Sequence, residues 1–93
     1  MINLYQKTWN EIDIGIAARL VRLRKRKKIS QQELAVRSGV SLGSVKRFEH
    51  GGEISLKSLT KIAIALGVEG ELDALFDAVP FASIDEVIYE QTK

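Results

Sequence analysis

The sequence contains no cysteine and a single histidine, His50, so it has almost none of the thiolate and imidazole ligands that zinc and similar metals use. Without thiols the chain forms neither disulfides nor thiolate metal sites. One histidine without a second ligand of that kind binds metal poorly. We therefore expect no metal and no cofactor.

The chain also lacks a long hydrophobic run. No stretch approaches the run of about 18 apolar residues that marks a transmembrane helix. The first residues, MINLYQKTWNEID, have neither the basic start nor the apolar centre of a signal peptide. These absences predict a cytoplasmic protein without a membrane anchor.

Signatures of catalysis are equally scarce. No serine, histidine and aspartate stand at a spacing typical of a nucleophilic triad. Gly39 and Gly43 imitate part of a phosphate-binding loop, but no lysine follows the second glycine. We interpret four acidic residues as a solubilising helix face rather than a catalytic pair: Glu69, Glu71, Asp73 and Asp77. We expect no enzymatic activity.

The only proline, Pro80, marks one boundary in a chain of 93 residues, a length that suggests a single domain. We divide the chain into an N-terminal arm at residues 1–10, a helical domain at residues 11–79 and an acidic C-terminal extension at residues 80–93. A short helix at residues 84–90 fits the pattern of the extension, and a strand within PFASIDEVIY remains open.

Positive and negative charges are distributed unevenly along the chain. Residues 1–68 contain 13 Lys/Arg and 5 Asp/Glu, a balance of +8, whereas residues 69–93 contain 1 and 7, a balance of −6. Together they give the net charge of +2. A basic body favours a polyanionic partner, and the acidic remainder indicates a different role for the tail.

The first predicted helix runs from about residue 9 or residue 14 to residue 27. Its start is open between two N-caps, Thr8 in a capping box with Glu11, and Asp13. The basic run Arg24–Lys28 ends it, which suits the negative end of the helix dipole. The predicted buried face has spacings of four, four and three residues: Ile12, Ile16, Leu20 and Leu23.

Four more helices follow, and most have clear start and stop signals. Serine N-caps precede the second, third and fourth helices: Ser30, Ser41 and Ser55. Glycines end the same three helices: Gly39, Gly51 and Gly67. The fifth predicted helix runs from about residue 70 to residue 79. Because no strand is indicated before Pro80, the pattern predicts an all-α fold.

The segment SQQELAVRSGVSLGSVKRFEHG, residues 30–51, joins the second and third helices through a tight turn. Ala35 is small where the two helices cross, Gly39 takes the turn, and Val45 fills the angle between the helices. With the preceding basic run and the following SLKSLTKIAIALGV, the segment resembles the phage-repressor and Cro-like helix-turn-helix family, also called the XRE family. The resemblance covers about residues 14–75.

The resemblance implies a five-helix repressor-like helix-turn-helix DNA-binding domain with a short C-terminal extension. It also implies a structural ion pair between Arg24 and Glu49. It further implies a DNA-binding surface in which the third helix reads bases: Gln31, Ser41, Leu42, Gly43, Ser44, Lys46, Arg47, His50 and Lys57. Lys46 and Arg47 would donate to guanine, and Leu42 would pack on a thymine methyl.

The expected partner is double-stranded DNA, bound by a homodimer on a palindromic operator, and the expected function is transcriptional repression. The predicted dimer or partner surface is apolar: Leu75, Phe76, Val79, Phe81, Ile84, Val87 and Ile88. An alternative is an antitoxin that binds a toxin protein and represses its own operon. A co-transcribed toxic gene would favour that alternative. A membrane-surface module built on the basic first helix leaves the second and third helices unexplained.

Overall fold

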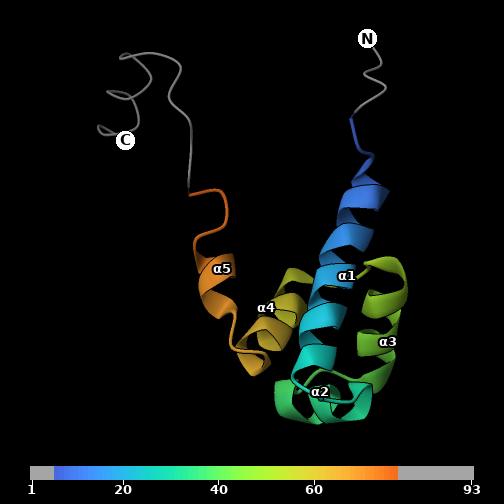
Figure 1. Cartoon of the computed structure of the whole chain (residues 1–93), viewed down its shortest axis with the longest axis vertical. Coiled ribbons are helices and arrows are strands. Elements are labelled where there is room, and N and C mark those ends of the chain that lie inside the picture. The colour runs from blue at the N-terminus through green and yellow to red at the C-terminus, as the bar shows by residue number, and fades with distance from the viewer. Residues whose placement is uncertain (1–5, 78–93) are drawn as a thin grey trace.

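The computed structural model describes residues 6–77, and within that range it contains five α-helices and no strand. The helices are α1 (Trp9–Arg26), α2 (Gln31–Ser38), α3 (Leu42–Gly51), α4 (Leu56–Ala65) and α5 (Glu69–Asp73). α1 runs along the molecule with α3 on one side and α4 and α5 on the other, while α2 lies across its C-terminal end (Figure 1). The predicted all-α fold is confirmed.

Hydroxyl side chains begin the first four helices. Thr8, Ser30, Ser41 and Ser55 each accept a hydrogen bond from the backbone N–H three residues later, at 3.0–3.2 Å. Each bond satisfies one of the N–H groups that lack an intrahelical partner in the first turn. Thr8 is therefore the N-cap of α1, Asp13 lies inside the helix, and α1 includes the last two residues of the predicted arm.

A glycine ends α3, one residue later than predicted. Gly51 is the last helical residue, and Gly52 takes the left-handed conformation with φ of 76°. A Cβ on Gly52 would lie only 2.8 Å from backbone atoms of Asp13, so α1 passes too close for any other residue. Judged by the local sequence, either Gly51 or Gly52 could end α3. Only Gly52 lies so close to α1 that a side chain would clash there.

The buried face of α1 differs from the predicted one. Its buried residues are Ala17 and Arg24, and the small Ala17 lets the helix pack closely on the core. Ile12 is 48% exposed, and Trp9 in the first turn is 76% exposed. The remaining predicted core residues of α1 are only partly buried against the core: Ile16, Leu20 and Leu23.

α5 is shorter than predicted and ends at Asp73 rather than near residue 79. Phe76 has φ of 65°, a left-handed conformation that no helix continues through. α5 also contains no buried residue, so core packing contributes little to extending it. The predicted helix at residues 84–90 and the open strand both lie outside the described residues.

Candidate nucleic-acid interface

α2 and α3 form a compact corner around a tight turn. Gly39 has φ of 73° and closes α2 by donating its N–H to the carbonyl oxygen of Ala35 at 3.0 Å. Val40 follows and is buried, which fixes the direction in which the chain enters α3. Ala35 and Val45 belong to the same buried cluster, so small and branched residues fill the corner. This is the geometry of a helix-turn-helix.

A buried ion pair ties this corner to α1. Arg24 donates to the Glu49 carboxylate through Nε at 2.7 Å and Nη2 at 3.0 Å, and each side chain is only 9% exposed. Arg24 also donates through Nη1 to the carbonyl oxygen of Ile29 at 2.7 Å. Arg24 is thus part of the framework that holds α1 against α3, and it is not a free cation for DNA.

Gln31 joins the same network. Its side-chain Nε2 donates to Glu49 Oε1 at 2.8 Å, which anchors the first turn of α2 to α3. The side chain of this predicted DNA-binding residue is therefore already engaged within the protein. Its backbone N–H lies in the first turn of α2, where N–H groups lack an intrahelical partner.

One face of α3 is exposed along its whole length. Gly43, Lys46, Arg47 and His50 are all exposed, at spacings of three, one and three residues. Because α-helical side chains repeat every 3.6 residues, this spacing places them on one side. The buried residues Val45 and Phe48 occupy the opposite side. The structure thus brings these four predicted site residues onto one surface.

Most of the other predicted DNA-contact residues have side chains that already make contacts within the protein. Ser41 caps α3, and its hydroxyl donates a hydrogen bond to Ser44 Oγ at 2.8 Å. The two serine side chains are therefore partly occupied with each other. Leu42 is partly buried and packs against the core, which leaves only part of its side chain for a base. Lys57 is exposed in the first turn of α4.

A shallow depression joins α1, α2 and α3 beside the exposed face of α3. Its lining includes three predicted site residues and the buried pair: Val21, Arg24, Lys25, Gln31, Lys46, Glu49 and His50. Lys25 also lines this depression, although the sequence analysis did not include it among the expected DNA contacts. Its position next to Arg24 in α1 is the only signal that places it on the side of α3.

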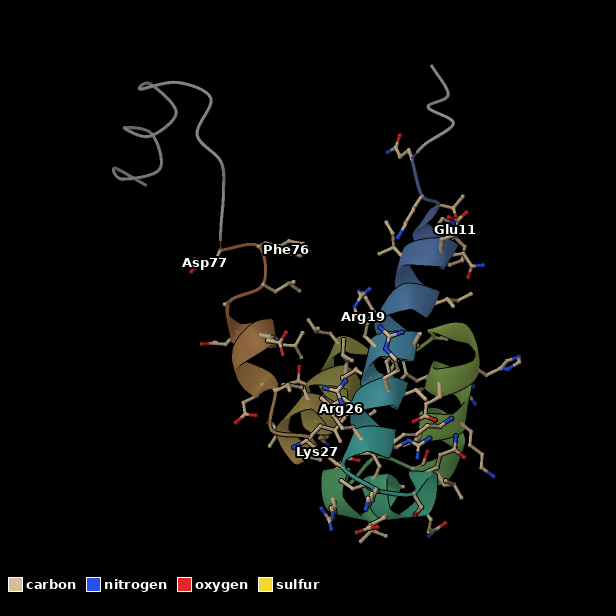
Figure 2. The ribbon with its side chains drawn as sticks, in the orientation of Figure 1. Glu11, Arg19, Arg26, Lys27, Phe76 and Asp77 are labelled. Atoms are coloured by element: carbon tan, nitrogen blue, oxygen red, sulfur yellow. The ribbon has the colours of Figure 1, made fainter. Side chains whose placement is uncertain are left out.

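The basic run of α1 does not form one patch. Arg24 is buried and Lys25 faces the depression beside α3. Arg26 and Lys27 project instead on the side of α1 that faces α4 and α5, as Arg19 does (Figure 2). The helix period therefore divides the run between two surfaces, and only part of it adds positive potential next to α3.

Residues 6–77 were also searched for a membrane-spanning helix and for a metal site. No helix in that range is long and apolar enough to cross a membrane. The same residues contain no group of three or more histidine, aspartate or glutamate side chains arranged to hold a metal ion.

The corner of α2 and α3, with a cationic face on α3, defines a helix-turn-helix DNA-binding domain. A comparison with protein families matches residues 20–72 to the family described as helix-turn-helix. Because the match spans more than half of the chain, this chain belongs to the phage-repressor and Cro-like (XRE) helix-turn-helix family. Comparisons with curated proteins and with solved structures give no match. The protein is a DNA-binding transcriptional regulator.

Proposed function

We propose that the protein is a sequence-specific repressor that binds a palindromic operator as a homodimer, with α3 in the major groove. The observation that supports this proposal is the exposed pair Lys46 and Arg47, which lies opposite the buried face of α3. The buried face sets the orientation of the helix, so both cations project outward. A dimer that occupies a promoter in this way blocks RNA polymerase.

Base recognition in this proposal depends mainly on the two cations. Arg47 presents a planar guanidinium that donates to both O6 and N7 of guanine, and Lys46 donates to either acceptor. Gly43 adds no side chain, so the backbone of the first turn of α3 approaches the base edges closely. The exposed part of Leu42 suits a thymine methyl group.

Phosphate contacts set the register of the complex and carry no direct sequence information. The N–H groups at the start of α2, including that of Gln31, suit a phosphate as helix N-termini do. We assign the remaining polar site residues to phosphates or neighbouring base edges: Ser41, Ser44, His50 and Lys57. Lys25 joins this set because it lines the same depression as His50.

The proposed homodimer requires an apolar surface that the isolated chain leaves uncovered. Leu75 is 51% exposed and Phe76 is 85% exposed, and both follow α5. Exposed apolar groups that adjoin one another are typical of interaction sites. The other proposed contact residues lie outside the described residues: Val79, Phe81, Ile84, Val87 and Ile88. Two half-sites would then lie about one helical turn, roughly 34–36 Å, apart.

Selecting bound sequences from a random duplex pool tests the proposal. The wild-type chain is expected to select an inverted repeat. Lys46→Ala or Arg47→Ala is expected to relax the preference at one base pair of each half-site, at a cost of about 1–3 kcal/mol. Lys61→Ala is the matched control, because it removes an exposed positive charge from α4. Equal losses on all duplexes would assign the residue to phosphate binding instead.

Gly43→Gln is expected to change the selected sequence without weakening the fold. No atom lies within 4 Å of a Cβ built on Gly43, and glutamine forms helix more readily than glycine. The new amide would favour adenine through N6 and N7. Gly70→Gln in α5 is the control, because its Cβ also meets no atom within 4 Å. A lower melting temperature with an unchanged selected sequence would contradict this role for position 43.

A further inference from the structure

A second depression adjoins the exposed face of α3. It has a cavity volume of about 280 Å³, and four residues line it: Arg47, Glu53, Ile54 and Ser55. One of the two proposed base-reading cations therefore shares this depression with a carboxylate from the loop that joins α3 to α4. None of the DNA contacts proposed above uses Glu53.

The fold holds the backbone on both sides of Glu53. Gly52 packs against the backbone of α1, where a Cβ would lie at only 2.8 Å. Ile54 packs against the core, and Ser55 caps α4 by accepting a backbone N–H of that helix at 3.1 Å. Because the residues before and after it are held in this way, Glu53 keeps its place at the edge of the depression.

Glu53 differs from the other two carboxylates of residues 31–55. Glu33 pairs with an arginine of its own helix, and Glu49 accepts three hydrogen bonds inside the corner. The two ion pairs found within residues 6–77 involve neither Glu53 nor Arg47, and both of these side chains are exposed. Among the three carboxylates, Glu53 is thus the one whose charge remains available to a base-reading cation.

A carboxylate beside Arg47 changes how the guanidinium is used. The guanidinium has five N–H donors in a rigid planar fork, and a bidentate contact with guanine uses only two of them. A carboxylate accepts hydrogen bonds from the remaining donors and so orients the plane of the fork. Without such a partner the long side chain reaches phosphate as readily as a base, and a phosphate contact carries no direct sequence information.

The negative charge also separates bases from phosphates. Glu53 repels a phosphate that approaches the depression, and phosphate contacts supply essentially all of the non-specific affinity for DNA. The O6 and N7 acceptors of guanine carry no net charge, so a contact with them is penalised far less. Specificity is a difference between two affinities, and a repulsive group that weakens the wrong complex increases it.

We infer that Glu53 is a specificity-determining residue, which positions Arg47 on guanine and disfavours its contact with phosphate. An exposed pair of this kind contributes little to folding stability, so the role of Glu53 lies in recognition. The inference deepens the proposed function and rests on the proposed reading of bases by Arg47.

The test compares the wild-type chain and Glu53→Gln on three duplexes by fluorescence anisotropy. The duplexes are the selected sequence, the same sequence with the Arg47-dependent base pair replaced, and an unrelated sequence. In Glu53→Gln, the ratio of the first two affinities is expected to fall about tenfold, within the discrimination that one bidentate arginine contact supplies. Affinity for the unrelated duplex is expected to rise. Glu53→Asp keeps the charge and is expected to retain part of the ratio.

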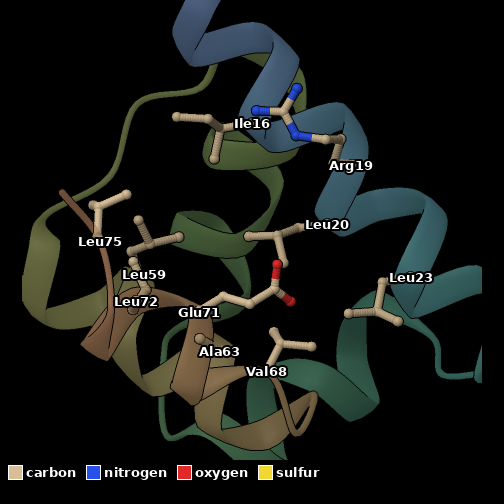
Figure 3. A pocket seen from close by; sticks show the side chains of 10 residues that line it. All are labelled: Ile16, Arg19, Leu20, Leu23, Leu59, Ala63, Val68, Glu71, Leu72 and Leu75. Atoms are coloured by element: carbon tan, nitrogen blue, oxygen red, sulfur yellow. The ribbon is translucent and has the colours of Figure 1, made fainter. Parts of the chain in front are cut away.

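A double variant, Arg47→Ala/Glu53→Gln, shows whether Glu53 acts through Arg47. In the Arg47→Ala background, Glu53→Gln is expected to cause no further loss of discrimination at that base pair. Glu71→Gln is the charge control, because Glu71 is an exposed carboxylate that lines an apolar groove between α1 and α5, away from α3 (Figure 3). It is expected to leave the ratio unchanged. All of these positions are exposed, so melting temperatures are expected to stay close to the wild-type value.

Three results would overturn the inference and leave recognition by Arg47 intact. Loss of discrimination at a different base pair would show that Glu53 itself accepts a hydrogen bond from cytosine N4. An equal rise in affinity on all three duplexes would show that Glu53 only repels phosphate. An unchanged ratio would show that Glu53 has no part in recognition. A wild-type chain without any sequence preference would overturn the proposed function as well.

Discussion

Glu49→Ala is expected to lower the free energy of unfolding by roughly 3–5 kcal/mol, more than any change on the exposed face of α3. The Glu49 carboxylate accepts three hydrogen bonds, two from Arg24 and one from Gln31. Removing it leaves the Arg24 guanidinium buried without its counter-charge, which costs more than the pair contributes. For a domain of this size the melting temperature falls by roughly 4–8 °C per kcal/mol, so thermal denaturation measures the effect readily.

Two further variants separate the loss of the buried ion pair from the loss of a surface charge. Arg37→Ala breaks the exposed pair between Arg37 and Glu33 on α2 and is expected to cost well under about 1 kcal/mol. Glu49→Gln keeps an acceptor oxygen and is expected to be milder than Glu49→Ala. DNA affinity is measured at a temperature where each variant is folded. A melting temperature unchanged in Glu49→Ala, combined with lost DNA binding, would show that Glu49 acts in recognition rather than in the fold.

Operator affinity is expected to fall by about 10³–10⁵-fold between about 50 mM and about 200 mM salt, if the dimer neutralises about 6–10 phosphates. Each phosphate contact releases condensed counterions from DNA, and added salt opposes that release. The cations that would make these contacts are exposed on three helices: Lys25, Lys46, Arg47 and Lys57. Fluorescence anisotropy with one operator duplex at several salt concentrations gives the slope.

Lys57→Ala separates phosphate contacts from base contacts in the same experiment. If Lys57 binds phosphate, the variant is expected to show a shallower slope, by about 0.9 for each lost contact, with an unchanged selected sequence. Lys61→Ala removes the same charge from the next turn of α4 and is expected to keep the wild-type slope. A wild-type affinity that does not respond to salt would exclude the proposed mode of binding.

Local signals were enough to place the starts of α2, α3 and α4, and they narrowed the start of α1 to two candidate caps, Thr8 and Asp13. A serine or threonine oxygen caps a backbone N–H three residues away, so this interaction needs no information from the rest of the fold. The turn at Gly39 and the buried position of Val45 follow from equally local requirements. This is why the helix-turn-helix, and with it the class of protein, was readable from residues 30–51.

The end of α3 and the buried face of α1 were predicted wrongly because both depend on contacts between residues far apart in the sequence. The stop of α3 moved to Gly52 because the backbone of α1 passes over it, an encounter between residues far apart in sequence. The apolar face of α1 was interpreted as core, yet Ala17 is the buried apolar residue of this helix, Ile12 is exposed, and Ile16, Leu20 and Leu23 are only partly buried. Periodicity shows that a helix has an apolar face but not which partner covers it.

For the charged residues, too, some properties follow from the sequence and others from the packing of the helices. Composition showed a basic body and an acidic remainder, and so a polyanionic partner. The arrangement of helices then buried Arg24 against Glu49, directed Lys25 toward α3 and directed Arg26 toward α5. The number and sign of charges are properties of the chain, whereas their pairing and direction depend on which helices pack together. For this protein, the amino acids alone specify a helix-turn-helix regulator, and the packing of its helices separates the residues that hold the fold from those left free to bind.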